Sequence, residues 1–268
     1  MIPSISVLKF GSSVLPDDDS LSVAVGEIAR RVKSGRRVVA VVSALGETTD
    51  RLIERATRLA GGREPDPASK AALLAVGELN GTASLSIVLN AAGVRATVLD
   101  ASSVALATEG PIDDARPVAL ARGVIVRALA SFPAVVVPGF VGRDDASGWS
   151  RTSLLGRGGS DLTALFIAAE LGADECVLLK DVDGLYDRDP SADPAARRFV
   201  RVNYDDVLAL DEGIVQHKAV RFAAGRALRF SVAAPGRAVG TLVWEGGSRA
   251  DDRAPIHHDA AGAGEVAR

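Results

Sequence analysis

The most informative stretch of this chain reads LLGRGGSDLTALFIAAELGA and spans Leu154–Ala173. A loop with three glycines runs directly into a strongly apolar helix, for which Ser160 or Asp161 is the natural N-cap. The amino end of such a helix presents N–H donors and a positive dipole to an anion. Arg157 stands within the glycine loop, and a plain capped helix does not explain a guanidinium there. The stretch therefore favours a site for a carboxylate or phosphate. The alternative role for Asp161 is to hydrogen-bond a catalytic lysine and fix its position.

Outward from this stretch, short apolar runs alternate with segments of helical periodicity. Continuous apolar runs suit buried parallel strands, which are covered on both faces. Strands are expected at Ile5–Phe10, Val38–Val42, Arg95–Leu99, Ala134–Val137, Cys176–Leu179 and Thr241–Trp244. Helices are expected at Leu21–Val32, Thr49–Leu59, Lys70–Ala91, Pro117–Ala130, Asp161–Leu171, Asp205–Leu210 and Val215–Ala224. The alternation predicts an α/β fold whose mainly parallel sheet is covered by helices on both faces.

The composition excludes several classes of protein. The 268 residues are 47% hydrophobic and 24% charged, which is enough apolar material for a substantial core. The net charge of −3 argues against a generic nucleic-acid-binding surface, which normally has a basic excess. Cys176 is the single cysteine, so no internal disulfide and no cysteine-based zinc cluster is expected. Two of the three histidines, His257 and His258, lie in a polar end segment, so no metal site is assigned.

No targeting or anchoring signal is evident. The first residues lack the basic region and the long apolar core of a secretory signal. No run approaches the roughly 18 consecutive apolar residues of a membrane helix. We therefore expect a cytoplasmic protein with no membrane partner. The segment 248–268, rich in Gly, Ala, Asp and Arg, is expected to be a flexible tail.

Small and charged residues follow several of the expected strands, which is where ligands bind in open parallel sheets. Lys9 lies at the end of the first strand. Three small residues after it let backbone N–H groups approach phosphate oxygens, namely Gly11, Ser12 and Ser13. The alternative is an ordinary turn beside a lysine that reaches solvent. Thr49, near the start of a helix, is either a simple cap or part of an anion site.

Glu78 is the one acidic residue of the apolar helix expected at Lys70–Ala91. A buried carboxylate without a partner costs several kcal/mol, so Glu78 needs a cation or a hydrogen-bond donor. Two partners are open at this point, a structural arginine and the ammonium group of a substrate.

The turn-rich segment Leu178–Pro190 and the helix expected at Val215–Ala224 supply candidates for nucleotide contacts. Acidic residues such as Asp181 either act on a metal-bound nucleotide or cap turns. Tyr186 is suited to stack on an adenine or to hydrogen-bond with it. Lys218 either reaches a nucleotide phosphate or faces solvent, which is the more common outcome for a lysine.

Taken together and in this order, these motifs resemble the amino-acid kinase family, and within it the catalytic region of aspartate kinases. The motifs are KFG, VSALGETTD, LLAVGE, VPGFVG, LLGRGGSD, KDVDGLYDRDP and the closing GTLV. The resemblance runs from Val7 to about Trp244. GRGGSD is its most specific motif, because it separates this branch from the glutamate 5-kinase, acetylglutamate kinase and uridylate kinase branches. The resemblance implies a three-layer αβα sandwich of the carbamate kinase-like type over residues 1–247. The amino-acid-binding lobe is expected at about 1–155 and the nucleotide-binding lobe at about 156–247.

The resemblance also implies a reaction, the transfer of the ATP γ-phosphate to the side-chain carboxylate of L-aspartate. The product is 4-phospho-L-aspartate, the cofactors are ATP and Mg²⁺, and no residue is assigned as a metal ligand. Lys9 and Asp161 match the catalytic positions. The positions that match aspartate contacts are Ser43, Thr49, Glu78, Arg157 and Ser160, with Glu78 facing the ammonium group. The positions that match nucleotide contacts are Lys9, Gly11, Ser12, Ser13, Gly158, Gly159, Lys180, Asp181, Tyr186, Arg188 and Lys218.

Several residues depart from the family pattern, mostly on the nucleotide side. Ser12 replaces the second glycine of the common KFGG opening, and Lys180 replaces the usual threonine. Ser191 stands where an arginine is usual, and Arg188 is the candidate substitute. Gly213 falls where a lysine or polar residue is common. These changes keep two alternatives open, a kinase for another carboxylate and a kinase-like regulatory subunit with weak activity.

Aspartate kinases usually continue into regulatory ACT domains, whereas this sequence stops shortly after the kinase core. We therefore expect that the chain alone does not respond allosterically to lysine or threonine. The resemblance also implies a homodimer, and a separate regulatory or downstream enzyme is a further expected partner.

Overall fold

The computed structural model describes residues 4–146, 148–210, 213–237 and 239–251. Its main sheet has the strands β1 (Ile5–Phe10), β2 (Arg37–Val42), β3 (Ala96–Val98), β6 (Ala134–Pro138), β9 (Glu175–Leu179), β10 (Phe199–Asn203), β11 (Phe230–Ala233), β12 (Thr241–Trp244) and β13 (Arg249–Ala250). Their order is β13-β10-β12-β11-β9-β1-β2-β6-β3. The pairs from β11 through β9, β1, β2 and β6 to β3 are all parallel, while β11–β12 and β10–β13 are antiparallel. The expected α/β class with a mainly parallel sheet is confirmed.

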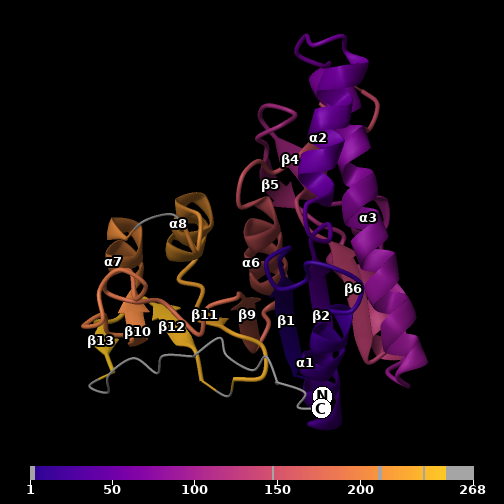
Figure 1. The fold of residues 1–268 in the computed structure, drawn as a ribbon. Helices are drawn as coiled ribbons and strands as arrows, with labels where there is room; N and C mark the ends of the chain where they lie inside the picture. The colour runs from indigo at the N-terminus through magenta and orange to yellow at the C-terminus, as the bar shows by residue number, and fades with distance from the viewer. Residues whose placement is uncertain (1–3, 147, 211–212, 238, 252–268) are drawn as a thin grey trace, which may run out of the picture.

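Helices cover both faces of this sheet and so form three layers (Figure 1). The helices are α1 (Leu21–Lys33), α2 (Thr48–Leu59), α3 (Pro67–Ala91), α4 (Ala101–Val104), α5 (Arg122–Ser131), α6 (Gly159–Leu171), α7 (Tyr204–Ala209) and α8 (His217–Gly225). On one face Val7 and Val39 lie in a core with residues of α5, α6, α7 and α8. On the other face Leu8 and Phe10 lie in a core with residues of α1 and α3. Neighbours along a strand point to opposite faces, so alternate residues supply the two cores.

A second sheet of four strands has the order β5-β4-β7-β8. Its strands are β4 (Ala107–Glu109), β5 (Arg116–Ala119), β7 (Val141–Asp144) and β8 (Arg151–Leu154). The helix expected over Pro117–Ala130 is therefore wrong in its first part, because Pro117 lies in β5 and α5 starts at Arg122. β5 is an edge strand, where a proline is tolerated. The sequence of β5, RPVA, also lacks the continuous apolar run that identified other strands.

The end of the described chain differs from the expected flexible tail. Arg249 and Ala250 form β13, which pairs antiparallel with β10. The Ser248 hydroxyl accepts a hydrogen bond from the backbone N–H of Asn203 at 2.8 Å. Backbone pairing at a sheet edge holds this segment, and composition alone does not reveal such pairing. Residues 252–268, the remainder of the expected tail, lie outside the described residues.

Helix α3 is long and apolar enough, by length and composition, to span a membrane, although the sequence predicted no such segment. Its 25 residues include a window of mean hydropathy 1.5. Leu85 and Leu89, however, are fully buried in the core beneath the sheet. Glu78 is buried halfway along the helix. One face of α3 therefore packs in the core, while Val76, Leu79 and Ile87 on the helix are exposed.

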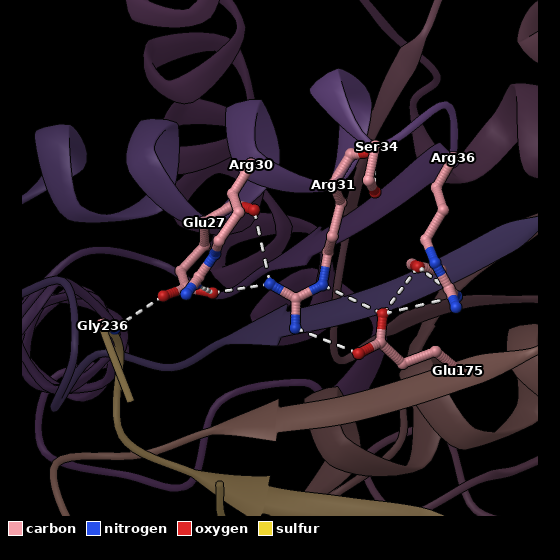
Figure 2. A network of polar contacts seen from close by, with 8 residues as sticks. Glu27, Arg30, Arg31, Ser34, Arg36, Glu175 and Gly236 are labelled. Atoms are coloured by element: carbon pink, nitrogen blue, oxygen red, sulfur yellow. Dashed lines mark hydrogen bonds and ion pairs between the residues drawn. The ribbon is translucent and has the colours of Figure 1, made fainter. Parts of the chain in front are cut away.

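A partly buried polar network fastens α1 to β9 and to the segment after β11 (Figure 2). Glu27 is 3% exposed and accepts hydrogen bonds from the backbone N–H of Gly236 and from Nη1 of Arg31, each at 2.6 Å. Nε of Arg31 also donates to Oε2 of Glu175, the first residue of β9, at 3.0 Å. Burial alone would raise the pKa of Glu27, but the Gly236 N–H and the neighbouring guanidinium groups outweigh it, and the pKa is lowered. The network therefore ties α1 to the amino end of β9 and to the segment after β11.

Candidate active site

A cavity of about 690 Å³ lies at the carboxyl ends of β1, β2 and β9. This edge is where ligands bind in open parallel sheets. The expected site residues that line it are Lys9, Ser12, Ser43, Thr49, Glu78, Arg157, Gly158, Gly159, Ser160, Asp161 and Lys180. The fold thus brings together segments that are far apart along the chain.

Asp161 lies at the centre of the charged groups in this cavity. It is 3% exposed, and its carboxylate lies between two ammonium groups. Nζ of Lys9 lies 2.8 Å from Oδ1 as an ion pair, and Nζ of Lys180 donates a hydrogen bond to Oδ2 at 2.8 Å. Burial alone would raise the pKa of Asp161, but the charges of Lys9 and Lys180 outweigh it, and the pKa is lowered. The carboxylate is therefore ionised at neutral pH and holds Lys9, which is the alternative role that the sequence left open.

The two-residue period of a strand explains why both lysines reach the same carboxylate. Lys9 is opposite Leu178 in the β1–β9 ladder, and Lys180 follows Leu178 by two residues. Residues with this spacing point to the same face of the sheet, which here is the face covered by α6. Asp161 lies in the first turn of α6 and meets both ammonium groups there.

The start of α6 differs from the expected cap. The helix begins at Gly159 with Gly158 as its N-cap, and neither Ser160 nor Asp161 caps it. Gly158 has a φ of 74°, and a Cβ at this position would lie 2.5 Å from Cβ of Gln216. Both observations require glycine. Asp161 lies inside the first turn of the helix and not at its N-cap, and its carboxylate is engaged by Lys9 and Lys180.

Glu78 lines the cavity from α3 and is 2% exposed. Its Oε1 accepts a hydrogen bond from the backbone N–H of Ala44 at 3.0 Å, while Oε2 has no hydrogen-bond partner among the described residues. Burial raises the pKa of Glu78 to about 8, and the Ala44 N–H and the charge of Lys9 offset only part of this effect. Within the described ranges no arginine pairs with Glu78, so the structure gives no support there to the structural-arginine alternative. A buried carboxyl of this kind suits a cationic ligand group.

Further polar groups surround these two carboxyl groups. Arg157 is exposed, lines the cavity, and makes no ion pair with any residue that the structure describes. Its guanidinium is therefore available for bidentate binding of a carboxylate. Thr49 lies in the first turn of α2 and Ser160 in the first turn of α6, so two helix amino ends meet at the cavity. Ser43 follows β2, and its backbone N–H is bonded to the carbonyl oxygen of Phe10 at 3.1 Å.

Other expected site residues do not line this cavity, namely Gly11, Ser13, Asp181, Tyr186, Arg188 and Lys218. Gly11 still borders the site, because a Cβ there would lie 2.6 Å from Nζ of Lys9. The hydroxyl of Tyr186 donates to Oδ1 of Asp183 at 2.9 Å, so this side chain is engaged within its own turn.

The two other cations expected at the nucleotide are paired with acids. Nη1 of Arg188 donates to Asp193 at 2.9 Å on the surface. Nζ of Lys218 lies 2.6 Å from Oδ1 of Asp114, and Lys218 lines a neighbouring cavity instead. This geometry gives no support to a phosphate contact from Lys218 or to Arg188 as a substitute for the missing arginine.

Sequence reasoning missed several lining residues. Lys70 lies two turns before Glu78 on α3, and its Nζ is 3.4 Å from Glu64. The spacing of Lys70, Leu74 and Glu78 places them on one helix face, and this signal could have identified Lys70. Asp113 and Phe140 also line the cavity, but each belongs to a connecting segment without periodicity.

The side chains of the cavity suit a metal ion that is bound mainly by the ligand and not by the protein. Among the described residues, no group of three or more His, Cys, Asp or Glu side chains could hold a metal ion. Both oxygens of Asp161 face ammonium groups, so this carboxylate is not available as a Mg²⁺ ligand. Mg²⁺ in phosphate sites is bound largely through substrate phosphates and waters, with one or two carboxylates.

The chain is similar in sequence and in fold to known proteins. An aspartokinase from Thermus thermophilus is 35% identical over 222 residues, which are 81% of this chain and 53% of the relative. An aspartate kinase from Pseudomonas fluorescens is 32% identical over 220 residues, which are 81% of this chain and 52% of the relative. The crystal structure of an aspartate kinase from Synechocystis has a TM-score of 0.76 at 27% identity, and the match covers 91% of this chain and 40% of that one.

The chain spans about half the length of the curated relatives that it matches. The model of the amino acid kinase family matches residues 4–230, which is most of the chain. Together with the α/β sheet, the strand-end cavity and the shared fold, this match shows that the chain belongs to the amino acid kinase family.

Proposed function

We propose that this chain is the catalytic region of an ATP-dependent aspartate kinase, which forms 4-phospho-L-aspartate. The observation that carries the proposal is the pairing of Lys9 and Lys180 on Asp161, in one cavity with Glu78 and Arg157. The two ammonium groups suit a phosphate, whereas Glu78 suits an α-ammonium group and Arg157 a carboxylate. The similarity to curated aspartokinases supports aspartate as the acceptor.

The proposed chemistry needs positioning and charge neutralisation more than covalent help. An oxygen of the acceptor carboxylate forms a bond to the γ-phosphorus. The bond to the bridging oxygen breaks, its electron pair stays on ADP, and the transfer itself moves no proton. The acceptor carboxylate is already ionised near pH 7, so no strong general base is required. Because both reactants are anions, Lys9, Lys180 and the N–H groups at the start of α6 offset their repulsion.

The proposal also divides the chain between the two substrates. Residues 1–155 hold the amino acid, supported by Glu78 and Thr49, with Arg157 and Ser160 as additional contacts from the second part, and residues 156–247 hold the nucleotide, supported by Lys180. Mg²⁺ is bound to the ATP phosphates and supplies further charge neutralisation when present. Lys9 lies in the first part and borders both substrates.

The test is ADP release from ATP with Mg²⁺ across a panel of amino acids and other carboxylates, with acyl phosphate trapped by hydroxylamine. We expect aspartate-dependent product, and a fall in kcat of about a hundredfold or more in Lys9→Ala. Lys33→Ala, an exposed lysine in the last turn of α1, is the matched control and should behave as the wild type. Product with a different carboxylate would instead identify a sister kinase. A folded protein that yields no product with any acid would contradict the proposal and favour a regulatory subunit.

The proposal includes a homodimer whose interface lies on the solvent side of α3. Val76, Leu79 and Ile87 are 60%, 45% and 70% exposed. From residue 71 to residue 91 the helix carries no charged side chain except the buried Glu78. A long uncharged apolar face is typical of an interaction surface. In a two-fold dimer the same face meets itself, so a second copy supplies a partner of matching character.

A further inference from the structure

We propose that Lys180 is a second phosphate-binding ammonium, which contacts the terminal phosphate of a nucleoside triphosphate beside Lys9. The inference rests on the proposed kinase function and deepens it. It gives a role to Lys180, which stands at a position where aspartate kinases usually have a threonine.

Lys180 is held in place before any ligand binds. Its Nζ donates to Oδ2 of Asp161 at 2.8 Å, and its backbone N–H donates to the carbonyl oxygen of Ala233 at 3.0 Å. The side chain is 12% exposed and lines the cavity. A lysine fixed at both its backbone and its ammonium group loses little rotamer freedom when a ligand arrives.

Lys9 and Lys180 contact different oxygens of Asp161. Nζ of Lys180 donates to Oδ2, and Nζ of Lys9 lies 2.8 Å from Oδ1. An ammonium group has three donors, and the contact with Asp161 occupies at most one on each lysine. Donors therefore remain for ligand oxygens in the cavity that both lysines line.

The net charge of the cluster formed by Lys9, Lys180 and Asp161 favours the binding of an anion. Two ammonium groups share one carboxylate, so the cluster carries a net positive charge. Burial lowers the pKa of Lys180, and repulsion from Lys9 lowers it further. The attraction of Asp161 offsets only part of this decrease in pKa. Glu78 adds little negative charge at neutral pH, because its pKa is about 8. A phosphate group between the two ammonium groups relieves their repulsion and forms charge-assisted hydrogen bonds with both.

The test is binding of ATP, ADP and AMP, each with Mg²⁺, measured by calorimetry for the wild type and two variants. Lys180→Met removes the charge and all donors, while Lys180→Gln removes the charge but keeps a donor for Asp161. We expect both variants to lose about tenfold or more in ATP affinity, less for ADP, and nothing for AMP. The kcat with aspartate should fall as well, and Lys180→Arg should recover most of both. Lys33→Met is the matched control and should leave nucleotide binding unchanged.

Several outcomes would overturn the inference. One such outcome is a folded Lys180→Met variant whose ATP affinity and kcat both stay within about twofold of the wild type. The loss of a charge-assisted hydrogen bond should lower both by more than this. Another is an ATP affinity and a kcat equal to those of the wild type in Lys180→Gln. This result would make Lys180 only a positioning residue for Asp161. Equal losses for ATP and AMP would indicate a general structural defect and also count against it. If Lys180→Met does not fold, Lys180→Gln decides.

The same experiment separates this inference from the proposed function. A wild-type chain that binds ATP through Lys180 but phosphorylates no acid would contradict the proposed function and leave the inference intact. A wild-type chain that binds no ATP would contradict both.

Discussion

The backbone N–H of Ala44 donates to Oε1 of Glu78 at 3.0 Å, and it is the one hydrogen bond that this buried carboxyl group accepts among the described residues. The contact joins α3 to the segment after β2 at the wall of the cavity. Because the pKa of Glu78 is about 8, its side chain is mostly neutral at pH 7 before a ligand binds. The charge on Glu78 therefore depends on what occupies the cavity.

Binding of the amino acid is expected to release protons at pH 7. A bound α-ammonium group stabilises the ionised form of Glu78 and lowers its pKa, so the proton held in the free protein passes to the buffer. Calorimetry in two buffers with different ionisation enthalpies measures this release. Glu78→Gln should bind the amino acid more weakly and release no proton. Heats of binding that do not depend on the buffer would show that Glu78 does not meet the ammonium group.

Glu27→Gln is expected to destabilise the fold at neutral pH and to have little effect in acid. The folded-state pKa of Glu27 is lowered from 4.5, so its contribution is complete above about pH 4.5 and is lost as the pH falls through the folded-state value. We expect a loss of about 1–3 kcal/mol at pH 7 from the broken contacts to Gly236 and Arg31. Urea unfolding at several pH values measures it.

The matched control for Glu27 is Glu47→Gln. Glu47 forms an exposed i,i+4 pair with Arg51, so its replacement should cost less than about 0.5 kcal/mol at any pH. A loss in Glu27→Gln that is the same at pH 7 and in acid would contradict the electrostatic account.

Gly158→Ala is expected to destabilise the protein more than Gly35→Ala does. Both glycines have positive φ, 74° and 85°, so alanine at either position costs about 1 kcal/mol in backbone strain. Only at Gly158 would the new Cβ also lie 2.5 Å from Gln216, whereas nothing lies within 4 Å at Gly35. Denaturant unfolding of the two variants isolates the cost of this contact. Equal losses would mean that the loop before α6 is not held against the segment before α8.

Charged residues on the solvent side of α3 are expected to separate the proposed dimer. Val76→Glu combined with Ile87→Glu places charges on its most exposed apolar positions, and burying them in an interface is unfavourable. Leu59→Glu, at a position 71% exposed on α2, is the control and should leave the assembly intact. Sedimentation equilibrium measures the mass. A wild type that is monomeric at every concentration would refute the interface on α3.

Much of the main sheet could be predicted from local pattern. Continuous apolar runs identified β1, β2, β6 and β9, because strands buried on both faces need such residues at every position. The second sheet was missed, because β4, β5, β7 and β8 are short and each contains polar residues, so that none forms a continuous apolar run. Strands this short are stabilised by pairing with distant segments, and one-dimensional periodicity does not record such pairing.

The candidate site was predicted unevenly for a related reason. Lys9, Glu78, Arg157 and Asp161 were singled out because each is out of place in its local context, and all line the cavity. Among the residues expected to contact the nucleotide, Tyr186 donates to Asp183 and lies outside the lining, so its contact with a nucleotide stays a prediction. Which acid a cation meets depends on the packing of separate segments, so local sequence does not determine it.

The amino-acid sequence alone specifies the alternation of strands and helices, the glycine loop before α6 and which charged residues stand at the strand ends. These features depend on residues that are close neighbours along the chain. Only the packed structure decides that Lys180 shares Asp161 with Lys9, that Lys218 meets Asp114, and that the pKa of Glu78 is raised. Each of these three features depends on burial and on distances between segments that are remote in sequence. Burial and these distances are set only when the layers pack against one another.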